Sequence, residues 1–373
     1  MHPILFFADR LPPLAGGMEV HAGHFIEHFS GHPRYPLLAV VTRDLDQRDC
    51  LLRGDRREPV AMGDLPARLP SAPSIVFFNS GRWIEALEDI RAAFPRATFV
   101  YRTGGNEIVK APLDGDGRGD HRARQAFWVE RLGKCIDLLI TNSAFTEERL
   151  ISLGLRRELF ARVVGGVDVE ALRAARSARR APGAPPALFC AARFVPYKNH
   201  AFLCQVLAIL ARRGRRFRLE LAGDGPLLEA TRDDVRRLGI SNEVAFLGLL
   251  TNEEVCTRIA GADFYIQLSV NLVTEVPGGS YVHAEGMGRS ILEALSCGTF
   301  VIAARSGALP EVVTPERGLL VDLGPAELAA DRIEPLLRDP PCRPPFFEGY
   351  SWIRCFSRYE ELWDTIHARA DRH

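Results

Sequence analysis

The chain has 373 residues, and its 47 basic residues balance 47 acidic residues, so the formal net charge is zero. A chain of this length usually forms two domains, and a composition of 47% hydrophobic and 25% charged residues is typical of an ordinary globular protein. The balanced charge gives no argument for a nucleic-acid partner. No apolar run approaches the ~18 residues of a transmembrane helix.

The eight cysteines form no CxxC pair, and the N-terminus lacks the basic region and small-residue cleavage site of a signal peptide. We therefore expect reduced thiols in a cytoplasmic protein. Peripheral contact with the inner face of a membrane stays open as an alternative.

The first half of the chain alternates short apolar strands with helices. The predicted strands cover residues 3–8, 37–41, 74–78, 97–101 and 138–140. The predicted helices cover residues 17–30, 83–92 and 143–153, with a further helix that follows a Gly/Asp-rich loop at 104–120 and ends near 134. Continuous apolar strands of this kind are typical of a parallel sheet that helices cover on both faces.

The alternation restarts after residues 173–186, which are rich in Arg, Ala and Pro and which we interpret as a linker. The predicted strands are 187–191, 218–222, 244–247, 264–266, 299–303 and 318–321, and the predicted helices are 200–212, 226–238, 252–260 and 351–369. The pattern predicts an α/β protein of two doubly wound, Rossmann-like domains, residues 1–172 and 187–351, that face a central cleft. A C-terminal helix at about 352–373 is a further candidate to pack on the first domain. Ligands of such folds bind at the carboxyl ends of the strands.

Two carboxylates lie eight positions apart in the second half. Glu285 and Glu293 flank a glycine-containing turn that leads into an apolar helix, which Cys297-Gly298 ends before the strand at 299–303. A helix N-terminus presents unpaired N–H groups and a partial positive charge, which favour a phosphate. Because eight helical residues span at most ~12 Å, the two carboxylates could hold the two ends of a nucleotide sugar.

These features resemble the retaining GT-B glycosyltransferases of group 1, also called family 4, over nearly the whole chain. The resemblance is carried by EGMGRSILEALSCG at 285–298, AARFVPYKN at 191–199 and PPLAGGME at 12–19. In this family the first Glu contacts the donor sugar, the second binds the ribose, and the N–H groups between them hold the diphosphate. An Arg and a Lys about five residues apart neutralise the leaving diphosphate, a role that needs no metal.

The resemblance assigns roles to individual residues. It implies that Glu285, Arg193 and Lys198 act in catalysis. It implies donor contacts from Gly16, Gly17, Arg193, Lys198, Leu249, Glu285, Gly286, Met287, Gly288, Arg289, Ser290, Ile291 and Glu293. Many family members carry a His near the acceptor where residues 101–107 here read YRTGGNE, so we expect Glu19, Arg102, Asn106 and Glu107 to serve the acceptor. The stretch 270–284 is longer than the segment that usually precedes the first Glu in this family, and it could form a lid.

The implied activity is the retaining transfer of a hexose or N-acetylhexosamine from a nucleoside-diphosphate sugar to a hydroxyl of a glycan, a lipid-linked precursor or a natural product. On family frequency a UDP sugar is the first expectation and GDP-mannose the second. Neither a metal nor another cofactor is expected. A nucleotide-sugar epimerase of the same architecture is an alternative, although it is not expected to carry E-x7-E. A non-catalytic nucleotide-binding protein is another, against which the intact set of charged residues argues.

Each motif also has a purely structural interpretation. The two Glu residues could be solvated helix carboxylates, and Arg193 with Lys198 a solvated loop. Gly16-Gly17 could be a strand-to-helix turn that needs positive φ.

Three other patterns resemble known binding signatures. His21, His24 and His28 share a predicted helix face, but HExxH and nearby cysteines are absent, which disfavours a metal site. Asp114-Gly115-Asp116 resembles a metal-binding DxD motif but has no strand directly before it. Basic and aromatic residues at 122–134 leave membrane-surface binding open, although the apolar members are more often core.

Overall fold

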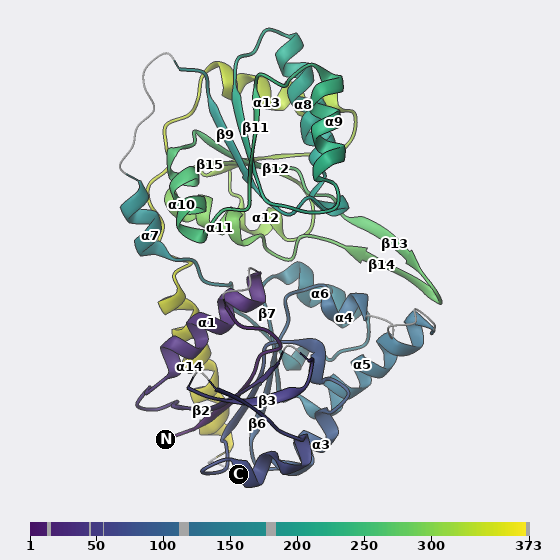
Figure 1. Cartoon of the computed structure of the whole chain (residues 1–373), viewed down its shortest axis with the longest axis vertical. Helices are drawn as coiled ribbons and strands as arrows, with labels where there is room; N and C mark the ends of the chain where they lie inside the picture. The colour runs from purple at the N-terminus through teal and green to yellow at the C-terminus, as the bar shows by residue number, and fades with distance from the viewer. Residues whose placement is uncertain (13–15, 45, 55, 112–118, 177–183, 371–373) are drawn as a thin grey trace. The chain divides into compact units, whose positions relative to one another are not determined.

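The computed structural model describes residues 1–12, 16–44, 46–54, 56–111, 119–176 and 184–370, which form two compact units. Unit 1 comprises Met1–Gly165, Val273–Val282 and Trp352–His373, and unit 2 comprises Gly166–Leu272 and His283–Ser351. Each unit has a largely parallel sheet covered by helices (Figure 1). The predicted α/β class with two doubly wound domains is therefore confirmed.

Unit 1 is built on an eight-stranded sheet in the order β4-β3-β2-β1-β5-β6-β7-β8. The strands are β1 Ile4–Phe7, β2 Leu37–Arg43, β3 Asp49–Arg53, β4 Arg56–Pro59, β5 Ile75–Phe78, β6 Thr98–Arg102, β7 Leu138–Thr141 and β8 Phe160–Arg162. The helices are α1 Gly17–Phe29, α2 Leu65–Arg68, α3 Leu87–Ala93, α4 Glu107–Lys110, α5 His121–Cys135, α6 Ala144–Ser152 and α14 Trp352–Ala370. The strand order reverses between β1 and β5, so the carboxyl ends of these strands form the switch point at which doubly wound sheets bind ligands.

Neighbouring side chains on β1 enter two different cores. Phe6 packs with α1 and α14, whereas Phe7 packs with α3 and α5. Successive side chains of a strand point to opposite faces, so a strand buried on both faces must be apolar throughout. This is why the continuous apolar runs in the sequence locate the central strands.

The edge strands of unit 1 were not predicted. The strand β4 reads Arg-Arg-Glu-Pro and is mostly exposed, and it pairs antiparallel with β3. A charged edge strand carries no apolar pattern, and its charges discourage pairing with other chains. Hydrophobic periodicity therefore does not predict strands of this kind.

Unit 2 is built on a six-stranded sheet in the order β11-β10-β9-β12-β15-β16, in which all neighbours are parallel. The strands are β9 Ala187–Ala191, β10 Arg218–Ala222, β11 Val244–Gly248, β12 Phe264–Gln267, β15 Phe300–Ala304 and β16 Gly318–Val321. The helices are α7 Val169–Ala175, α8 His200–Arg212, α9 Leu228–Leu238, α10 Asn252–Gly261, α11 Arg289–Cys297, α12 Leu309–Val312 and α13 Ala326–Arg338. The switch point of this sheet lies between β9 and β12.

The helices of unit 2 form two groups. Helix α8 packs against α9 and α13, while α7, α10 and α11 pack on one another. Leu188 and Cys190 of β9 belong to the core that contains α8 and α13, and Phe189 between them lies with residues of α10. Helix α13 was not predicted, because Pro335 lies inside it and a proline in a helical pattern usually indicates an end.

The unassigned stretch at 270–284 contains a hairpin of β13 Leu272–Val276 and β14 Gly279–His283. Its residues 273–282 belong to unit 1, although the chain enters and leaves the hairpin from unit 2. Within unit 1 the His121 N–H donates to the Pro277 carbonyl at 3.0 Å, and Tyr281 packs against the α3–α5 core. The expectation that this stretch forms a lid stays a prediction.

The boundary between the two units differs from the predicted domain boundary, and part of the predicted linker is helical. The first segment of unit 1 ends at Gly165, whereas the sequence placed the first domain at 1–172. Helix α7 continues to Ala175, so residues 173–175 of the predicted linker are helical. Residues 177–183 lie outside the described residues.

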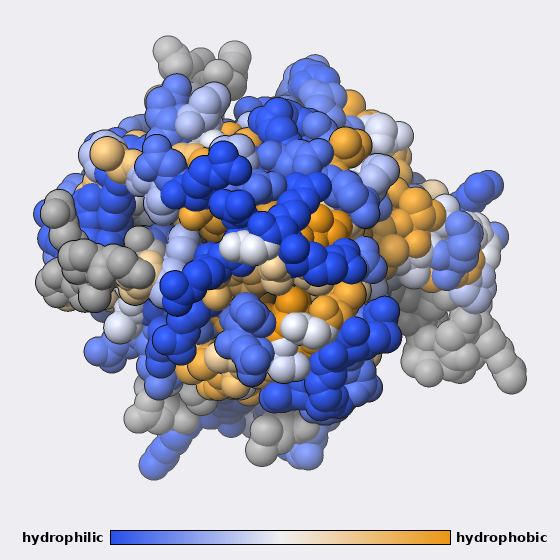
Figure 2. All heavy atoms as spheres, turned by 90° about the horizontal axis from the view of Figure 1, so that it is seen from above, coloured by the Kyte–Doolittle hydropathy of each residue, from blue (hydrophilic) through white to orange (hydrophobic). Residues whose placement is uncertain are grey.

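One face of the molecule is seen in Figure 2, where hydrophilic side chains predominate and hydrophobic ones gather in the hollows between them. Such a distribution is typical of a surface in contact with water. Within the described part of the chain, no helix is both long and apolar enough to cross a membrane.

The last helix of the chain packs against the first. The yellow α14 runs beside the purple α1 in Figure 1, and the two helices contribute to one core with β1 and β5. Trp363 is fully buried there, 5.2 Å from the ring of Phe29 and also near that of Phe25. Its indole Nε1 has no hydrogen-bond partner among the described residues.

We expect Trp363→Ala to destabilise unit 1 by about 3–5 kcal/mol, because it leaves a cavity in this core. Trp363→Phe is the matched control, since it fills most of the space and removes an unpaired N–H; it should cost less than about 1.5 kcal/mol. Trp83, Trp128, Trp352 and Trp363 all belong to unit 1, so tryptophan fluorescence during urea unfolding reports on this unit. Equal midpoints for both variants would contradict the packing described.

Candidate functional site

A buried ion pair lies at the switch point of the unit 2 sheet. Lys198 ends the 3-10 turn that follows β9, and its Nζ lies 2.5 Å from Oε2 of Glu285. The two side chains are only 11% and 9% exposed. Burial alone would lower the pKa of the Lys198 ammonium, but the charge of Glu285 and the nearby Tyr197 more than offset this and raise the pKa. Lys198 is therefore a cation at neutral pH.

The two oxygens of Glu285 have different surroundings. Oε2 accepts from Lys198, from the Gln267 amide at 2.9 Å and from the Ser269 hydroxyl at 3.3 Å. Oε1 accepts no hydrogen bond from any described residue, and it is not shut off from solvent. The carboxylate is therefore held in place by one oxygen while the other can accept a hydrogen bond from a ligand.

The backbone of Glu285 is held by the turn after β15. The Ala308 N–H donates to the Glu285 carbonyl at 2.9 Å. Gly307, the residue before Ala308, has φ +54°, and a Cβ on it would lie 2.3 Å from the carbonyl oxygen of Glu285. The Ser306 hydroxyl donates to the Ser269 carbonyl at 2.5 Å, which connects this turn to the end of β12. Only glycine at 307 allows the turn to lie this close to Glu285.

Helix α11 begins beside this carboxylate. Its N-cap, Gly288, has φ +77° and no side chain with which to cap the helix. The Ser290 hydroxyl, in the first turn, lies 2.8 Å from the Tyr265 hydroxyl and 3.0 Å from the Ala191 carbonyl at the end of β9. These bonds fix the start of the helix, whose N–H groups and dipole favour an anion.

The remaining predicted donor residues of this segment pack tightly. Gly286 and Met287 are buried, and Ile291 belongs to the buried face of α11. Glu293 is 2% exposed, and its Oε1 lies 3.3 Å from Nε of Arg289 one turn earlier. Burial raises the pKa of Glu293, an effect that Arg289 opposes. The structure thus places Glu293 inside the unit, in contrast to the partly open Glu285.

Arg193 lies in the same β9–α8 connection as Lys198. Its guanidinium is exposed and has no ion pair with a described residue. The backbone on either side is fixed: the Ala192 N–H donates to the Ala222 carbonyl at 3.0 Å, and the Phe194 N–H to the Asp224 carbonyl at 2.9 Å. An uncompensated cation on a fixed loop is suited to bind an anion. Leu249, after β11, is 75% exposed and contributes nothing to the core.

The predicted Gly-Gly turn begins α1 in unit 1. Gly16 is the N-cap with φ −178°, and Gly17 is the first helical residue, so neither has positive φ. The structural alternative of a turn that needs positive φ is therefore wrong. A Cβ on Gly16 would lie 2.1 Å from a carboxylate oxygen of Glu19. Residues 13–15 of the same motif lie outside the described residues.

Three of the four predicted acceptor residues lie at or just after the carboxyl end of β6, and the fourth, Glu19, lies in the first turn of α1. Arg102 is the last residue of β6, and its Nη1 lies 3.1 Å from Oδ1 of Asn79, which follows β5. Glu107 accepts from the Gly104 N–H at 2.8 Å, and Oδ1 of Asn106 lies 3.4 Å from Nη1 of Arg149. Arg102 thus lies near the switch point of unit 1.

The three histidines of α1 do not converge on one point. His21 is buried, and its Nε2 lies 3.0 Å from the Tyr359 hydroxyl. His28 instead lies near His32 and Glu360, and the ligand atoms of these three are within 4.8 Å of one another.

The hydrogen bonds of His32 argue against metal binding by this group. The Tyr35 N–H donates to Nδ1 of His32 at 3.1 Å, which places the ring proton of the neutral imidazole on Nε2. That nitrogen faces Glu360 as a donor, at 3.6 Å, and in this tautomer it has no lone pair for a metal. The Asp114–Asp116 motif lies outside the described residues.

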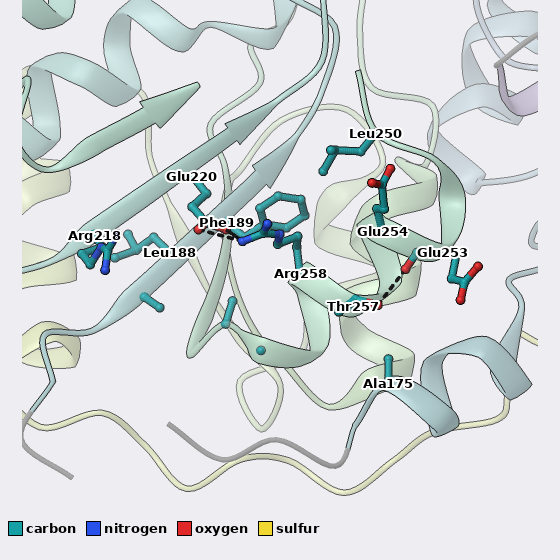
Figure 3. Close-up of a pocket in the computed structure, with 13 residues that line it drawn as sticks. Ala175, Leu188, Phe189, Arg218, Glu220, Leu250, Glu253, Glu254, Thr257 and Arg258 are labelled. Atoms are coloured by element: carbon teal, nitrogen blue, oxygen red, sulfur yellow. Dashed lines mark hydrogen bonds and ion pairs between the residues drawn. The ribbon is translucent and has the colours of Figure 1, made fainter. Parts of the chain in front are cut away.

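A separate pocket of about 550 Å³ opens between α10 and the sheet of unit 2 (Figure 3). Phe189 lines it together with Glu220 and Arg258, which form an ion pair at 3.0 Å. None of Arg193, Lys198 and Glu285 contributes to its lining. The pocket is therefore distinct from the site at the switch point.

Sequence reasoning missed the residues that hold Glu285 in place. Gln267 ends β12 and Ser269 follows it, and the sequence analysis placed only the apolar part of this strand. Polar residues directly after a buried strand at a switch point are the signal that would have found them. Asn79, which follows β5, was missed for the same reason.

The chain is similar to known glycosyltransferases. A model of the family "Glycosyl transferases group 1" matches residues 173–346. The chain is 28% identical over 390 aligned positions to the GDP-mannose-dependent alpha-(1-6)-phosphatidylinositol monomannoside mannosyltransferase of Mycobacterium tuberculosis, with 99% of this chain and 97% of that protein covered.

Two further relatives extend the comparison. The chain is 30% identical over 251 positions to the GDP-mannose-dependent monoacylated alpha-(1-6)-phosphatidylinositol monomannoside mannosyltransferase of Corynebacterium glutamicum, covering 65% of this chain and 61% of that one. Among solved structures, sucrose-phosphate synthase of Thermosynechococcus elongatus has a TM-score of 0.75 at 18% identity, over 99% of this chain and 100% of that chain.

The fold is that of the GT-B proteins, and the chain is a glycosyltransferase that uses nucleotide sugars. Residues 173–346 match the model of the group 1 glycosyltransferases, the family that the sequence motifs resemble.

His200, the first residue of α8, is a buried histidine whose pKa is affected by Lys198. It is 5% exposed and stacks on Phe194 with ring centroids 4.3 Å apart. Burial and then the charge of Lys198 lower its pKa to about 4. Between pH 6.5 and 4 the unfolded chain binds a proton that the folded protein does not.

We therefore expect acid to destabilise the protein, by at most about 1.4 kcal/mol per pH unit from this residue. His200→Gln should show a shallower loss of stability between pH 6.5 and 4.5 in urea unfolding. The difference between the two proteins at pH 8, where both side chains are neutral, measures the packing effect alone. Parallel stability curves over the whole range would show that His200 is not held neutral.

Proposed function

We propose that the chain is a retaining, metal-independent glycosyltransferase of family 4 that transfers mannose from GDP-mannose to a lipid-linked acceptor containing inositol phosphate. The names of the mycobacterial and corynebacterial relatives support this donor, although family frequency alone favoured a UDP sugar. A UDP-linked hexose or N-acetylhexosamine is the second candidate. The observation that carries the proposal is the Glu285 carboxylate, held through Oε2 with Oε1 open beside Lys198.

In this proposal the donor binds at the switch point of unit 2. Lys198 has three N–H donors and gives one to Glu285, so two remain for the diphosphate. Arg193 and the N–H groups at the start of α11 supply the other donors. Oε1 of Glu285 accepts from a sugar hydroxyl, and Glu293 serves the ribose.

The cations of this site stabilise the charge that develops on the leaving diphosphate. Fixed donors aimed at such a charge supply much of the stabilisation of a transition state. The leaving phosphate takes the proton of the acceptor hydroxyl, so no side chain acts as a strong base. The acceptor attacks the face from which the diphosphate departs, which keeps the anomeric configuration. Glu19, Arg102, Asn106 and Glu107 of unit 1 serve the acceptor.

Binding of nucleotides gives the first test. GDP and GDP-mannose should raise the melting temperature more than UDP or ADP and their sugars, because a ligand that binds only the folded state stabilises it. The double variant Lys198→Met with Glu285→Gln removes both charges without leaving either one buried alone. It should bind GDP at least tenfold more weakly in isothermal titration calorimetry.

Lys134→Met is the matched control for the loss of a lysine, since Lys134 is exposed and, among the described residues, forms an ion pair with Glu130 of its own helix alone. It should bind GDP as the wild type does. Unchanged GDP affinity in the double variant would refute the proposed donor site. A larger rise in melting temperature with UDP than with GDP would show that the donor is a UDP sugar and not GDP-mannose.

The stereochemistry and the metal requirement give a second test. GDP-mannose, which is an α-linked donor, should yield an α-mannoside when phosphatidylinositol vesicles serve as acceptor. NMR of the product measures its anomeric configuration, and the rate should be unaffected by EDTA. A β-linked product would exclude retention, and loss of activity with EDTA that Mg²⁺ or Mn²⁺ restores would exclude a metal-independent reaction.

A further inference from the structure

Arg102 is a buried cation without a counter-charge. Its residue is 8% exposed, and no carboxylate of a described residue forms an ion pair with it. The two hydrogen bonds that it donates come from Nη1, to Oδ1 of Asn79 and to Sδ of Met18, each at 3.1 Å. Both acceptors are uncharged.

The other groups around Arg102 are also neutral. Burial and then the charge of Arg102 itself hold the pKa of His21 well below its usual range, so this imidazole is uncharged at neutral pH. Burial raises the pKa of Tyr359, whose hydroxyl lies beside the guanidinium. Gly165 lies at its other side, where an added Cβ would be 4.0 Å from Nη2. The charge of Arg102 is therefore not neutralised from α1, from α14 or from the end of β5.

Two other arginines of unit 1 have counter-charges. Arg43 pairs with Asp9 at 2.5 Å, and Arg91 makes a bidentate contact with Asp137 at 2.7 and 3.1 Å. Removing a charge from water is costly unless an opposite charge or sufficient hydrogen bonds replace the water. An arginine buried among neutral groups thus lowers the stability of the free protein, which indicates that its partner is supplied from outside.

The guanidinium has donors to spare for such a partner. Arginine has five N–H groups, of which Nη1 uses two, and Tyr359 can accept one of the other three. The edge formed by Nε and Nη2 has the fork geometry that matches two oxygens of a phosphate. Arg102 also ends β6 near the switch point of the unit 1 sheet, where doubly wound sheets bind ligands.

We infer that Arg102 binds a phosphate ester of the acceptor and selects anionic acceptors over uncharged ones. This inference rests on the proposed function and adds the charge of the acceptor to it. The phosphates of the donor are assigned to Arg193 and Lys198, which leaves Arg102 for a different phosphate. Asn79 is a positioning residue, because it orients the guanidinium through Oδ1.

The test compares wild-type protein with Arg102→Met in thermal shift and calorimetry, in a phosphate-free buffer of low ionic strength. The probes are inositol 1-phosphate, uncharged myo-inositol, inorganic phosphate and GDP. Inositol 1-phosphate should bind the wild type at least tenfold more tightly than Arg102→Met, whereas GDP should bind both proteins equally. Binding of inorganic phosphate as tight as that of inositol 1-phosphate would show an anion site without acceptor specificity and would overturn the inference.

The stability of the free variants separates a binding role from a structural one. Arg102→Met should melt at the same temperature as the wild type or higher, because it removes an uncompensated buried charge. Arg91→Met, the matched control, should melt lower because it leaves Asp137 without its counter-charge. If Arg102→Met does not fold, Arg102→Lys keeps the charge but not the fork, and it should bind inositol 1-phosphate more weakly than the wild type while GDP binding is unchanged.

The outcomes distinguish this inference from the proposed function. If GDP binds neither protein, the donor site itself is refuted. If GDP binds both and inositol 1-phosphate affinity is the same with and without Arg102, only the present inference is overturned. Equal transfer to phosphatidylinositol and to an uncharged diacylglycerol acceptor by the wild type would also overturn it.

Discussion

The candidate site depends on one buried ion pair that joins two strands distant in the sequence. Lys198 lies in the connection after β9, and Glu285 lies before α11 in the long connection from β12 to β15. The strands β9 and β12 are neighbours only because the sheet order reverses between them. A buried pair of this kind is stable only when its remaining hydrogen-bonding groups are satisfied. Gln267 and Ser269 meet that requirement on one oxygen. The strand order of the sheet therefore brings together the residues that hold this oxygen of Glu285.

The central strands of both sheets were predictable from the sequence, whereas the edge strand β4, helix α13 and the hairpin of β13 and β14 were not. Strands such as β1 and β9 are buried on both faces, so each appears as a continuous apolar run. The charged strand β4 and the helix α13, with its internal proline, carry no such signal. The hairpin of β13 and β14 has alternating partly buried residues, and its packing within unit 1 follows from tertiary contacts that local sequence does not encode.

The candidate site was predictable where a motif is contiguous. Residues 285–293 and 193–198 each form one loop or helix start, so Lys198 and Glu285 could both be named as candidates from the sequence. The contact between Lys198 and Glu285 depends on the order of the strands in the sheet, which the motifs do not encode. The prediction that Glu293 binds the ribose rests on the family pattern, while its burial against Arg289 became visible only in the structure. Lys198 and Arg102 also show two ways to hold a buried cation, one neutralised internally and one not.

The return of α14 to α1 has a consequence for the synthesis of the protein. Unit 1 is assembled from the first and last segments of the chain, and Tyr359 and Trp363 complete a core that begins with Phe6 and Phe25. The N-terminal residues leave the ribosome first, yet the core on this face of their sheet, which α1 covers in part, lacks the side chains of α14 until that helix has been made. Domains generally fold in the order of their synthesis. In this chain the N-terminal unit is instead completed only after the segments of unit 2 have been made.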